Sequence, residues 1–458
     1  MRFLFTTLQT YESDFYGRVG AELARRGHDV AHLTVSRESA QLLREQGFDA
    51  RCVGDVVAAL DPPPSVSEEV RRIEATYDIP HIRDVYYADR VCRKRKEDWC
   101  IRRTVDHFRA VEHVFDELQP DVLVPEVGNE TIRVVSHLVG VQRGIPVLFL
   151  LYTIFPNPLR LYVDTLHAPI VSHDELRELS SAEHEELETF RRAFTQRATP
   201  IRDYHRWRVE WRRVKLFAGH LRRSLTSDRD NDYLQPGALL WRNAAETLRA
   251  MAARPFYDEL DPSRRFVYFP LHVTDDYKIL KVIPHCVDQA SLAEQVADAL
   301  PPGYDLVVKE HPMSVGRNSV RLLRRLRARH NVRLVAPRTS THELIRRSEA
   351  VAVISSTVGL EALLYDKPVL TLGQPFYSGY GVTLDVDSFR EIRAKVPAVL
   401  RFEPDPELIR RFLHAAMRAC YPGAPVLVDR SQQNAVTLAD SLERRAREVV
   451  PGASPVHA

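Results

Sequence analysis

The 458-residue sequence contains few cysteines and nothing that predicts a disulfide framework. The five cysteines stand at positions 52, 92, 100, 286 and 420, and none forms a CxxC pair. An odd number of widely spaced thiols argues against disulfide bonds, so we expect reduced and mostly buried cysteines, as in a cytosolic protein.

The sequence also lacks a long hydrophobic run and a strong charge of one sign. No stretch approaches the roughly 18 apolar residues of a membrane span, and the N-terminus lacks the apolar core and cleavage site of a signal peptide. A formal net charge of +2 creates no global field for nucleic acid. These absences predict a protein of the cytoplasm or of the cytoplasmic face of a membrane, without a nucleic-acid partner.

What is present predicts two α/β domains. Apolar residues make up 44% of the chain, and its length suits two domains of about 200 residues each. Short apolar strands alternate with helical patterns in both halves, which indicates parallel sheets with crossover helices. In the first half we expect strands at 2–8, 29–35, 121–124 and 146–152, with helices at 15–26 and 131–143. In the second half we expect strands at 265–269, 305–309, 332–335, 350–354 and 367–372.

This order predicts the α/β architecture called GT-B, in which two Rossmann-like domains face each other across a cleft. The predicted domains are an N-terminal acceptor domain with a helical insertion (1–190), a basic helical linker (191–262), a donor domain (263–400) and C-terminal helices that cross back to the first domain (401–458).

Three polar clusters follow strands of the second domain, where open α/β sheets bind ligands. In the first cluster, Lys309 and His311 can meet a phosphate by charge and by hydrogen bond, and Pro312 fixes the turn. A solvated surface turn is the alternative. In the second cluster, Ser355, Ser356 and Thr357 open a helix that can attract an anion.

Glu361, about one turn into that helix, could accept hydrogen bonds from ribose hydroxyls. Capping serines with a structural glutamate are the alternative for this second cluster. The third cluster contains His272 and Asp276. We take His272 as a candidate catalytic residue and Asp276 as a candidate donor ligand, although a loop histidine satisfied by its neighbours is equally compatible with the sequence. Because all three clusters are predicted at one edge of one sheet, together they predict a donor site.

These motifs resemble the capsular polysaccharide biosynthesis glycosyltransferases, which include the β-Kdo transferases of capsule export systems. The resemblance rests on Pro270-Leu271-His272, on Lys309-Glu310-His311-Pro312 and on the run from Ser355 to Ala362, and it covers roughly residues 265–385. It implies that His311, Ser355, Ser356 and Thr357 hold the donor phosphate and that Glu361 contacts the nucleoside. The sequence departs from the family at His272, where many members carry glutamine.

A glycosyl transfer also needs a carboxylate that acts as base or nucleophile. Glu126 is the first candidate, in a segment around Arg133 that resembles the family's acceptor domain. Asp14 is the second candidate, and it could equally be the N-cap of a helix that begins at Phe15. No DxD motif stands out, so we expect catalysis without a bound metal or other cofactor. The family resemblance implies a CMP-linked acidic sugar, with CMP-Kdo as the first guess for the donor.

The segment from Arg191 to Arg223 is strongly basic and carries Trp207 and Trp211. This pattern is found in helices that lie on an anionic membrane surface, and more often in helices that pack on their own domain with a solvated basic face.

The sequence therefore predicts a glycosyltransferase that acts on a cell-surface polysaccharide or glycolipid acceptor. Three alternatives remain open. They are a glycerophosphotransferase with a CDP-glycerol donor, a sugar epimerase of the same architecture, and a non-catalytic GT-B scaffold in polysaccharide export.

Overall fold

The computed structural model describes residues 1–167, 169–197, 211–229 and 231–450. The chain forms two compact units. Unit 1 consists of Met1–Ala168, Val209–Pro236 and Cys420–Ala458, and unit 2 consists of Pro169–Arg208 and Gly237–Ala419. The chain thus enters unit 2 at Pro169, earlier than the boundary at 190 that the sequence suggested.

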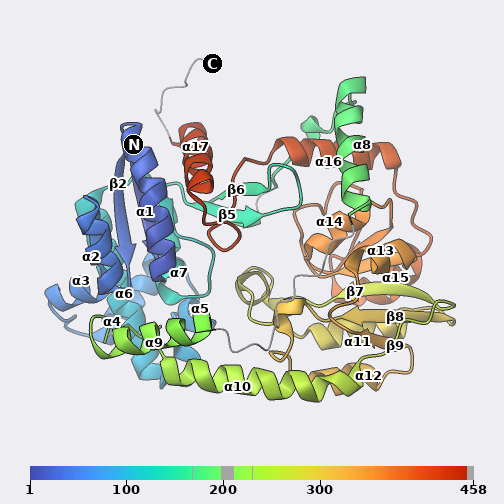
Figure 1. Cartoon of the computed structure of the whole chain (residues 1–458), viewed down its shortest axis with the longest axis horizontal. Coiled ribbons are helices and arrows are strands. Elements are labelled where there is room, and N and C mark those ends of the chain that lie inside the picture. Colours follow the sequence, from blue (N-terminus) through green and yellow to red (C-terminus); the bar gives the residue numbers. More distant parts are fainter. Residues whose placement is uncertain (168, 198–210, 230, 451–458) are drawn as a thin grey trace. The chain divides into compact units, whose positions relative to one another are not determined.

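Unit 1 is built on a four-stranded parallel sheet with the order β3-β2-β1-β4 (Figure 1). Its strands are β1 (Arg2–Thr7), β2 (Asp29–Thr34), β3 (Asp49–Cys52) and β4 (Val122–Val124). The central strands β1 and β4 carry the apolar runs Phe3–Phe5 and Val122–Val124, because a parallel sheet is covered on both faces. Its helices are α1 (Thr10–Arg25), α2 (Arg37–Glu45), α3 (Val53–Ala59), α4 (Val66–Thr76), α5 (Arg83–Tyr86), α6 (Glu97–Leu118), α7 (Thr131–Gln142), α9 (Trp211–Leu225) and α17 (Gln432–Val449).

The first helix begins earlier than the sequence pattern predicts. We expected a loop at residues 9–13 and a helix from Phe15, whereas α1 begins at Thr10. The reason is a capping box, in which the Glu12 carboxylate accepts the backbone N–H groups of Leu8 (2.8 Å) and Gln9 (3.3 Å). Asp14 therefore lies inside α1 and is not its N-cap.

The predicted strand at 146–152 does not join the parallel sheet as a full member. The strand β5 (Leu148–Tyr152) pairs antiparallel with β6 (Leu159–Val163), a strand that we did not predict. A single bridge between Leu123 and Val147 connects this hairpin to β4. The Rossmann pattern of unit 1 is thus extended by an antiparallel ribbon.

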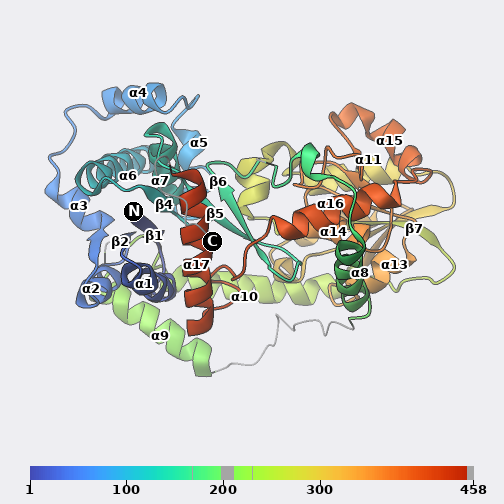
Figure 2. The same ribbon diagram turned by 90° about the horizontal axis from the view of Figure 1, so that it is seen from above.

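The C-terminal helix returns to unit 1, as the sequence predicts. Helix α17 packs against α1, and its Leu438 and Leu442 lie in the same core as Phe15 (Figures 1 and 2). An ion pair between Arg26 of α1 and Glu443 of α17 (3.2 Å) joins the two helices at their rim.

Unit 2 is built on a six-stranded parallel sheet with the order β12-β11-β10-β7-β8-β9 (Figure 1). Its strands are β7 (Arg265–Pro270), β8 (Tyr304–Lys309), β9 (Val332–Val335), β10 (Ala350–Val353), β11 (Val369–Thr371) and β12 (Leu384–Asp385). Its helices are α8 (Ser181–Thr195), α10 (Pro236–Ala253), α11 (Gln289–Ala299), α12 (Val320–Arg327), α13 (Thr341–Arg347), α14 (Thr357–Leu363), α15 (Ile392–Val399) and α16 (Pro406–Arg418). Two parallel sheets and the returning α17 confirm the α/β class and the connectivity expected of GT-B.

One buried carboxylate holds several segments of unit 1 together. Asp89 is fully buried, and its carboxylate accepts hydrogen bonds from Thr131 at the start of α7 (2.9 Å from N, 2.8 Å from Oγ1) and from the Tyr233 hydroxyl (2.7 Å). Arg103 of α6 pairs with it at 3.3 Å. Burial by itself would raise the pKa of Asp89, but the charge of Arg103 and these hydrogen bonds outweigh burial and hold the pKa below its ordinary value.

We therefore predict that Asp89→Asn lowers the free energy of unfolding by about 3 kcal/mol at pH 7, because Arg103 loses a buried partner. The lowered pKa stabilises the fold above the pKa of the unfolded carboxyl, and this contribution is lost as the pH falls below about 4. Urea denaturation at pH 7 and pH 4 tests the prediction. Asp116→Asn, which removes an exposed partner of Arg143, is the control and should cost less than about 1 kcal/mol. Equal losses in both variants would contradict it.

Candidate functional site

The three polar clusters predicted from the sequence lie at one edge of the unit 2 sheet. They follow β7, β8 and β10, which are neighbours in the sheet. The strand order reverses between β7 and β10, because the chain adds β8 and β9 on one side of β7 and β10 on the other. Ligands of open α/β sheets bind at such a switch point, outside the carboxyl ends of the strands. We call His272, His311, Ser355, Ser356 and Glu361 the unit 2 cluster.

One hydrogen bond joins the loops that follow β7 and β10 at the switch point. The backbone N–H of Ser355 donates to Nε2 of His272 at 3.1 Å, and the side chain of Gln289 accepts the His272 backbone N–H at 2.7 Å. Because Nε2 is an acceptor, the ring is neutral, with its proton on Nδ1. Burial, followed by the charges of Lys278 and His311, lowers the pKa of His272 to about 3, in agreement with a neutral ring. The structure thus gives His272 a positioning role, and Gln289 is a partner that the sequence analysis missed.

A glutamine could take the place of His272 in this contact. A glutamine Oε1 can accept the Ser355 N–H as the neutral His272 Nε2 does. The position requires an acceptor, and either residue supplies one.

The serine turn after β10 offers one hydroxyl that has no partner. Ser355 is 5% exposed, and its buried Oγ makes no hydrogen bond within the described residues. Ser356 is the N-cap of α14 and accepts the Val358 N–H at 3.2 Å. The Tyr377 hydroxyl donates to the Ser356 carbonyl oxygen at 2.5 Å, directly above Gly359. A Cβ at Gly359 would lie 2.1 Å from that hydroxyl, so only glycine fits there.

The His-Pro turn after β8 directs one imidazole nitrogen outward. Nδ1 of His311 accepts the Met313 backbone N–H at 3.1 Å, in the short helix that begins at Pro312. The proton of the neutral ring therefore lies on Nε2. Burial, followed by the charges of Lys309 and Arg317, lowers the pKa of His311. The exposed His311 can thus donate a hydrogen bond to an anion.

The neighbouring Glu310 has a structural role. It is 1% exposed, and its carboxylate accepts hydrogen bonds from Asn318 Nδ2 (2.7 Å) and from the Tyr257 hydroxyl. Thr274, in the loop after β7, donates to Asn318 Oδ1 at 2.6 Å, so Asn318 links two loops of the site. Nothing in the sequence pattern marked Asn318 or Tyr257, because both contacts are long-range.

The charges of Lys309 and Glu361 act on each other beneath the turns, although the two side chains form no direct ion pair. The Lys309 ammonium donates to the Thr339 carbonyl and to Thr341 Oγ1, both at 2.7 Å, and burial lowers its pKa to about 8. Burial raises the pKa of Glu361 to about 7, and the charge of Lys309 opposes that rise. The Lys309 side chain is 6% exposed, so it lies deeper than the phosphate contact predicted from the sequence. The remaining candidate, Asp276, accepts the Lys278 backbone N–H at 2.7 Å, and burial raises its pKa.

The first candidate base lies at the switch point of unit 1, between β1 and β4. Glu126 follows β4, is 7% exposed and accepts a short hydrogen bond from the Tyr16 hydroxyl. Burial raises its pKa to about 7, although Arg133 opposes the rise. The backbone φ of Glu126 is +43°, an uncommon value for a residue other than glycine, and such strain is often found at functional sites.

Arg133 fixes the residues around Glu126. Its guanidinium holds Glu12 through two hydrogen bonds of 2.9 Å, and it also donates to the Val127 carbonyl at 3.2 Å. We call Glu12, Tyr16, Glu126 and Arg133 the unit 1 cluster. Asp14 lies outside this cluster, because its exposed carboxylate pairs with Arg18 at 3.1 Å.

The basic segment from Arg191 to Arg223 is only partly open to description. Residues 198–210, with Trp207, lie outside the described residues, and so do the side chains of residues 211–216, with Trp211. Arg191 does not contribute to a basic surface, because it is buried and pairs with Asp366 at 2.6 Å. Within the described ranges, no helix combines the length and the apolar character needed to cross a bilayer.

No group of three or more His, Cys, Asp or Glu side chains is arranged to hold a metal ion in the part of the chain that the structure describes. The absence of a metal from the reaction stays a prediction.

The fold and this site define an α/β protein with two parallel sheets and a polar cluster at the switch point of the second. Residues 223–421 match the model of the family described as "Capsule polysaccharide biosynthesis protein". The matched residues contain the whole unit 2 cluster. The family resemblance predicted from the sequence is therefore confirmed over this range.

Individual relatives match shorter parts. Protein FixF of Sinorhizobium fredii is 31% identical over 159 residues, which are 34% of this chain and 38% of FixF. The capsule polysaccharide export protein KpsS of Escherichia coli is 32% identical over 111 residues, 23% of this chain and 27% of KpsS. These matches thus span less than half of each relative. A solved structure, the β-Kdo 2,4 transferase of KpsC from Thermosulfurimonas dismutans, is 19% identical, with 66% of this chain and 79% of that chain covered and a TM-score of 0.33.

We predict that His272→Gln keeps the stability at pH 7 within about 1 kcal/mol of the native protein, because the acceptor for the Ser355 N–H is retained. The folded pKa of about 3 lies below that of an unfolded histidine, about 6.5, so the unfolded state binds more protons between these values. His272 therefore makes the fold less stable as the pH falls below about 6.5, and the glutamine variant should lose this part of the pH dependence.

Urea denaturation from pH 4 to pH 8 measures the effect. His272→Ala has no acceptor and should be less stable throughout. His330→Gln, a change of an exposed histidine, is the control. An unchanged pH profile in His272→Gln would contradict a buried neutral ring.

Proposed function

We propose that this protein is a metal-independent glycosyltransferase that moves a sugar from a CMP-linked acidic sugar, with CMP-Kdo as the first guess, to a polysaccharide or glycolipid acceptor. The observation that carries the proposal is the set of directed donors at the unit 2 switch point. The Ser355 hydroxyl is buried without a partner, and Nε2–H of His311 points away from its own turn. The match of residues 223–421 to the capsule polysaccharide family model supports a saccharide product.

In this proposal the unit 2 cluster binds the nucleotide. His311 and Ser355 donate hydrogen bonds to the donor phosphate, and Ser356 and Thr357 lie beside it at the turn. Glu361 accepts hydrogen bonds from the ribose. The same donors stabilise the negative charge that develops on the phosphate as the bond from the anomeric carbon to the phosphate oxygen breaks. The nucleotide leaves with the electron pair of that bond.

We assign the carboxylate chemistry to Glu126. A buried glutamate with a pKa of about 7 is suited to accept a proton from an acceptor hydroxyl near neutral pH. The hydroxyl oxygen then forms the new bond to the anomeric carbon. Attack by the carboxylate itself would instead produce a glycosyl-enzyme, and the stereochemistry of the product separates the two routes.

The same motifs also support glycerophosphate transfer from CDP-glycerol, because the enzymes that use this donor carry a His-Pro turn and a Ser-Ser turn as well. The two reactions differ in the product. Glycerophosphate transfer leaves phosphorus in the product, whereas glycosyl transfer leaves none.

An anionic membrane surface stays a proposed partner. Because Arg191 is buried, a basic face would have to be formed by later residues such as Arg222, whose side chain is 73% exposed.

We predict that CMP raises the melting temperature more than CDP, UDP or GDP does, because ligands that bind only the folded state stabilise it. His311→Ala and Ser355→Ala should each weaken CMP binding by about tenfold, the value of one hydrogen bond to a charged group. Thermal-shift titration measures both effects. His330→Ala is the matched control, since His330 is exposed and precedes β9 at the opposite edge of the same sheet. Stabilisation by none of the four nucleotides would refute the proposal.

We predict that Glu126→Gln lowers the rate of sugar transfer by at least about a hundredfold and leaves CMP binding unchanged, because the amide cannot accept the proton. Asp14→Asn should leave the rate within about a factor of three, since it changes an exposed ion pair. Release of CMP in the presence of acceptor measures the rate. The reverse ranking of the two variants would assign the base to Asp14.

A further inference from the structure

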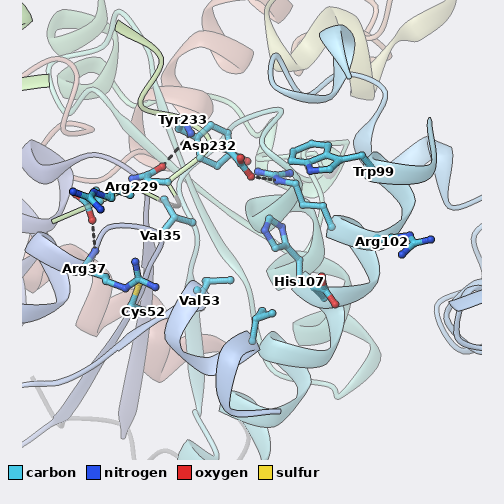
Figure 3. A pocket seen from close by; sticks show the side chains of 16 residues that line it. Val35, Arg37, Cys52, Val53, Trp99, Arg102, His107, Arg229, Asp232 and Tyr233 are labelled. Atoms are coloured by element: carbon cyan, nitrogen blue, oxygen red, sulfur yellow. Dashed lines mark hydrogen bonds and ion pairs between the residues drawn. The ribbon is translucent and has the colours of Figure 1, made fainter. Parts of the chain in front are cut away.

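Unit 1 contains a second feature that its predicted chemistry does not use, a cavity of about 530 Å³. Figure 3 shows its walls, which come from the residue after β2, the start of α3, one face of α6, and residues 228, 229 and 231–233. We call it the unit 1 cavity. Its volume falls within the range of small-molecule sites, roughly 300 to 1,000 Å³. Its walls include no member of the unit 1 cluster.

The stacked side chains of Trp99, Arg103 and Tyr233 form one wall of the cavity. Trp99 and Arg103 lie one turn apart on α6, so their side chains share a face. The Arg103 guanidinium lies 5.6 Å from the Trp99 ring centre and 5.1 Å from the Tyr233 ring centre. Its Nε donates to Asp232 at 2.9 Å (Figure 3). The buried contact between Arg103 and Asp89 fixes these side chains in one orientation. The Arg95 guanidinium also lies over the Trp99 ring, 5.0 Å from its centre, and the Trp99 side chain is partly exposed.

A buried histidine lies on the next turn of the same face. His107 is 7% exposed and lines the cavity, and its Nδ1 has no hydrogen-bond partner within the described residues. Burial, followed by the charge of Arg103, lowers its pKa well below the ordinary value, so the ring is neutral. A neutral imidazole offers one donor and one acceptor, which is the pair that a sugar hydroxyl uses.

The charges of the cavity are nearly balanced. Four arginines and three aspartates line it: Arg37, Arg102, Arg103 and Arg229 with Asp106, Asp228 and Asp232. Two of these arginines already hold carboxylates, Arg37 at Asp55 (2.7 Å) and Arg103 at Asp232. Balanced charge beside apolar residues such as Val53 and Val57 favours an uncharged ligand rich in hydroxyls over a phosphate.

From these residues we propose that the unit 1 cavity binds a saccharide, with one ring beside the partly exposed Trp99 side chain and its hydroxyls hydrogen-bonded to Asp232 and His107. The saccharide would be an interior sugar of a glycan that the protein extends, held apart from the unit 1 cluster. This identity of the ligand rests on the proposed function, whereas the binding itself does not.

Binding of defined saccharides to the full chain tests the proposal. Three uncharged trisaccharides, chitotriose, maltotriose and cellotriose, are titrated, with saturation-transfer NMR to detect contact and calorimetry to measure Kd. At least one trisaccharide should bind saturably, and Trp99→Ala should weaken that binding by about tenfold or more, as expected for a central aromatic contact. Trp241→Ala, which removes a 77% exposed indole from unit 2, is the matched control and should leave Kd unchanged.

A second variant distinguishes a loss of the binding site from a folding defect in Trp99→Ala. Val57→Trp keeps Trp99 and fills the cavity from α3, so it should also abolish saccharide binding while its melting temperature stays close to that of the native protein. Saturable binding of none of the three sugars, binding unaffected by either variant, or displacement of the sugar by CMP or inorganic phosphate would each overturn the proposal.

The CMP thermal shift separates this proposal from the proposed function. If CMP stabilises the protein and no sugar binds, only the saccharide site fails. If a sugar binds at Trp99 and CMP has no effect, the glycosyltransferase proposal fails and the saccharide site stands.

Discussion

The hydrogen bond from the Ser355 amide to His272 Nε2 is the contact on which the unit 2 site depends. It joins the loops that leave β7 and β10, the two strands between which the sheet reverses its order. A neutral imidazole is needed to accept that N–H, and burial keeps the ring neutral. With the backbone of Ser355 fixed in this way, its hydroxyl is held buried and unpaired at the place where α/β sheets bind ligands.

The two units use buried polar groups for different purposes. In unit 1, Asp89 satisfies every donor that approaches it, so its contacts stabilise the fold. In unit 2, the Ser355 hydroxyl is buried without compensation, which costs free energy in the unliganded protein. The unpaired Ser355 hydroxyl supports the proposed donor site, and the match of residues 223–421 to the capsule polysaccharide family model determines which class of ligand to test first.

The carboxylates of unit 1 show how similar residues acquire different chemistry. Glu12 is held by Arg133 and by the backbone N–H of Leu8 before α1, so its role is structural. Glu126, in the same cluster, is buried against the Tyr16 hydroxyl, and burial brings its pKa to about 7. Asp14 is in solvent on α1. Environment, rather than residue type, thus makes Glu126 the stronger candidate for proton transfer.

The sequence by itself determined the class of fold and the edge of the sheet at which the unit 2 site lies. Strands such as β7 and β10 are continuous apolar runs whose carboxyl ends carry the polar residues, and this pattern is local. Only the tertiary structure decided which of those residues are directed toward a ligand. The partners of His272, Glu310 and Lys309 are Ser355, Asn318 and Thr339, and such contacts follow from strand order and loop packing. The hairpin β5–β6 was missed for the same reason, since its antiparallel pairing outweighs the local pattern. The start of α1 is different, because its capping carboxylate, Glu12, is a local signal that the apolar pattern does not contain.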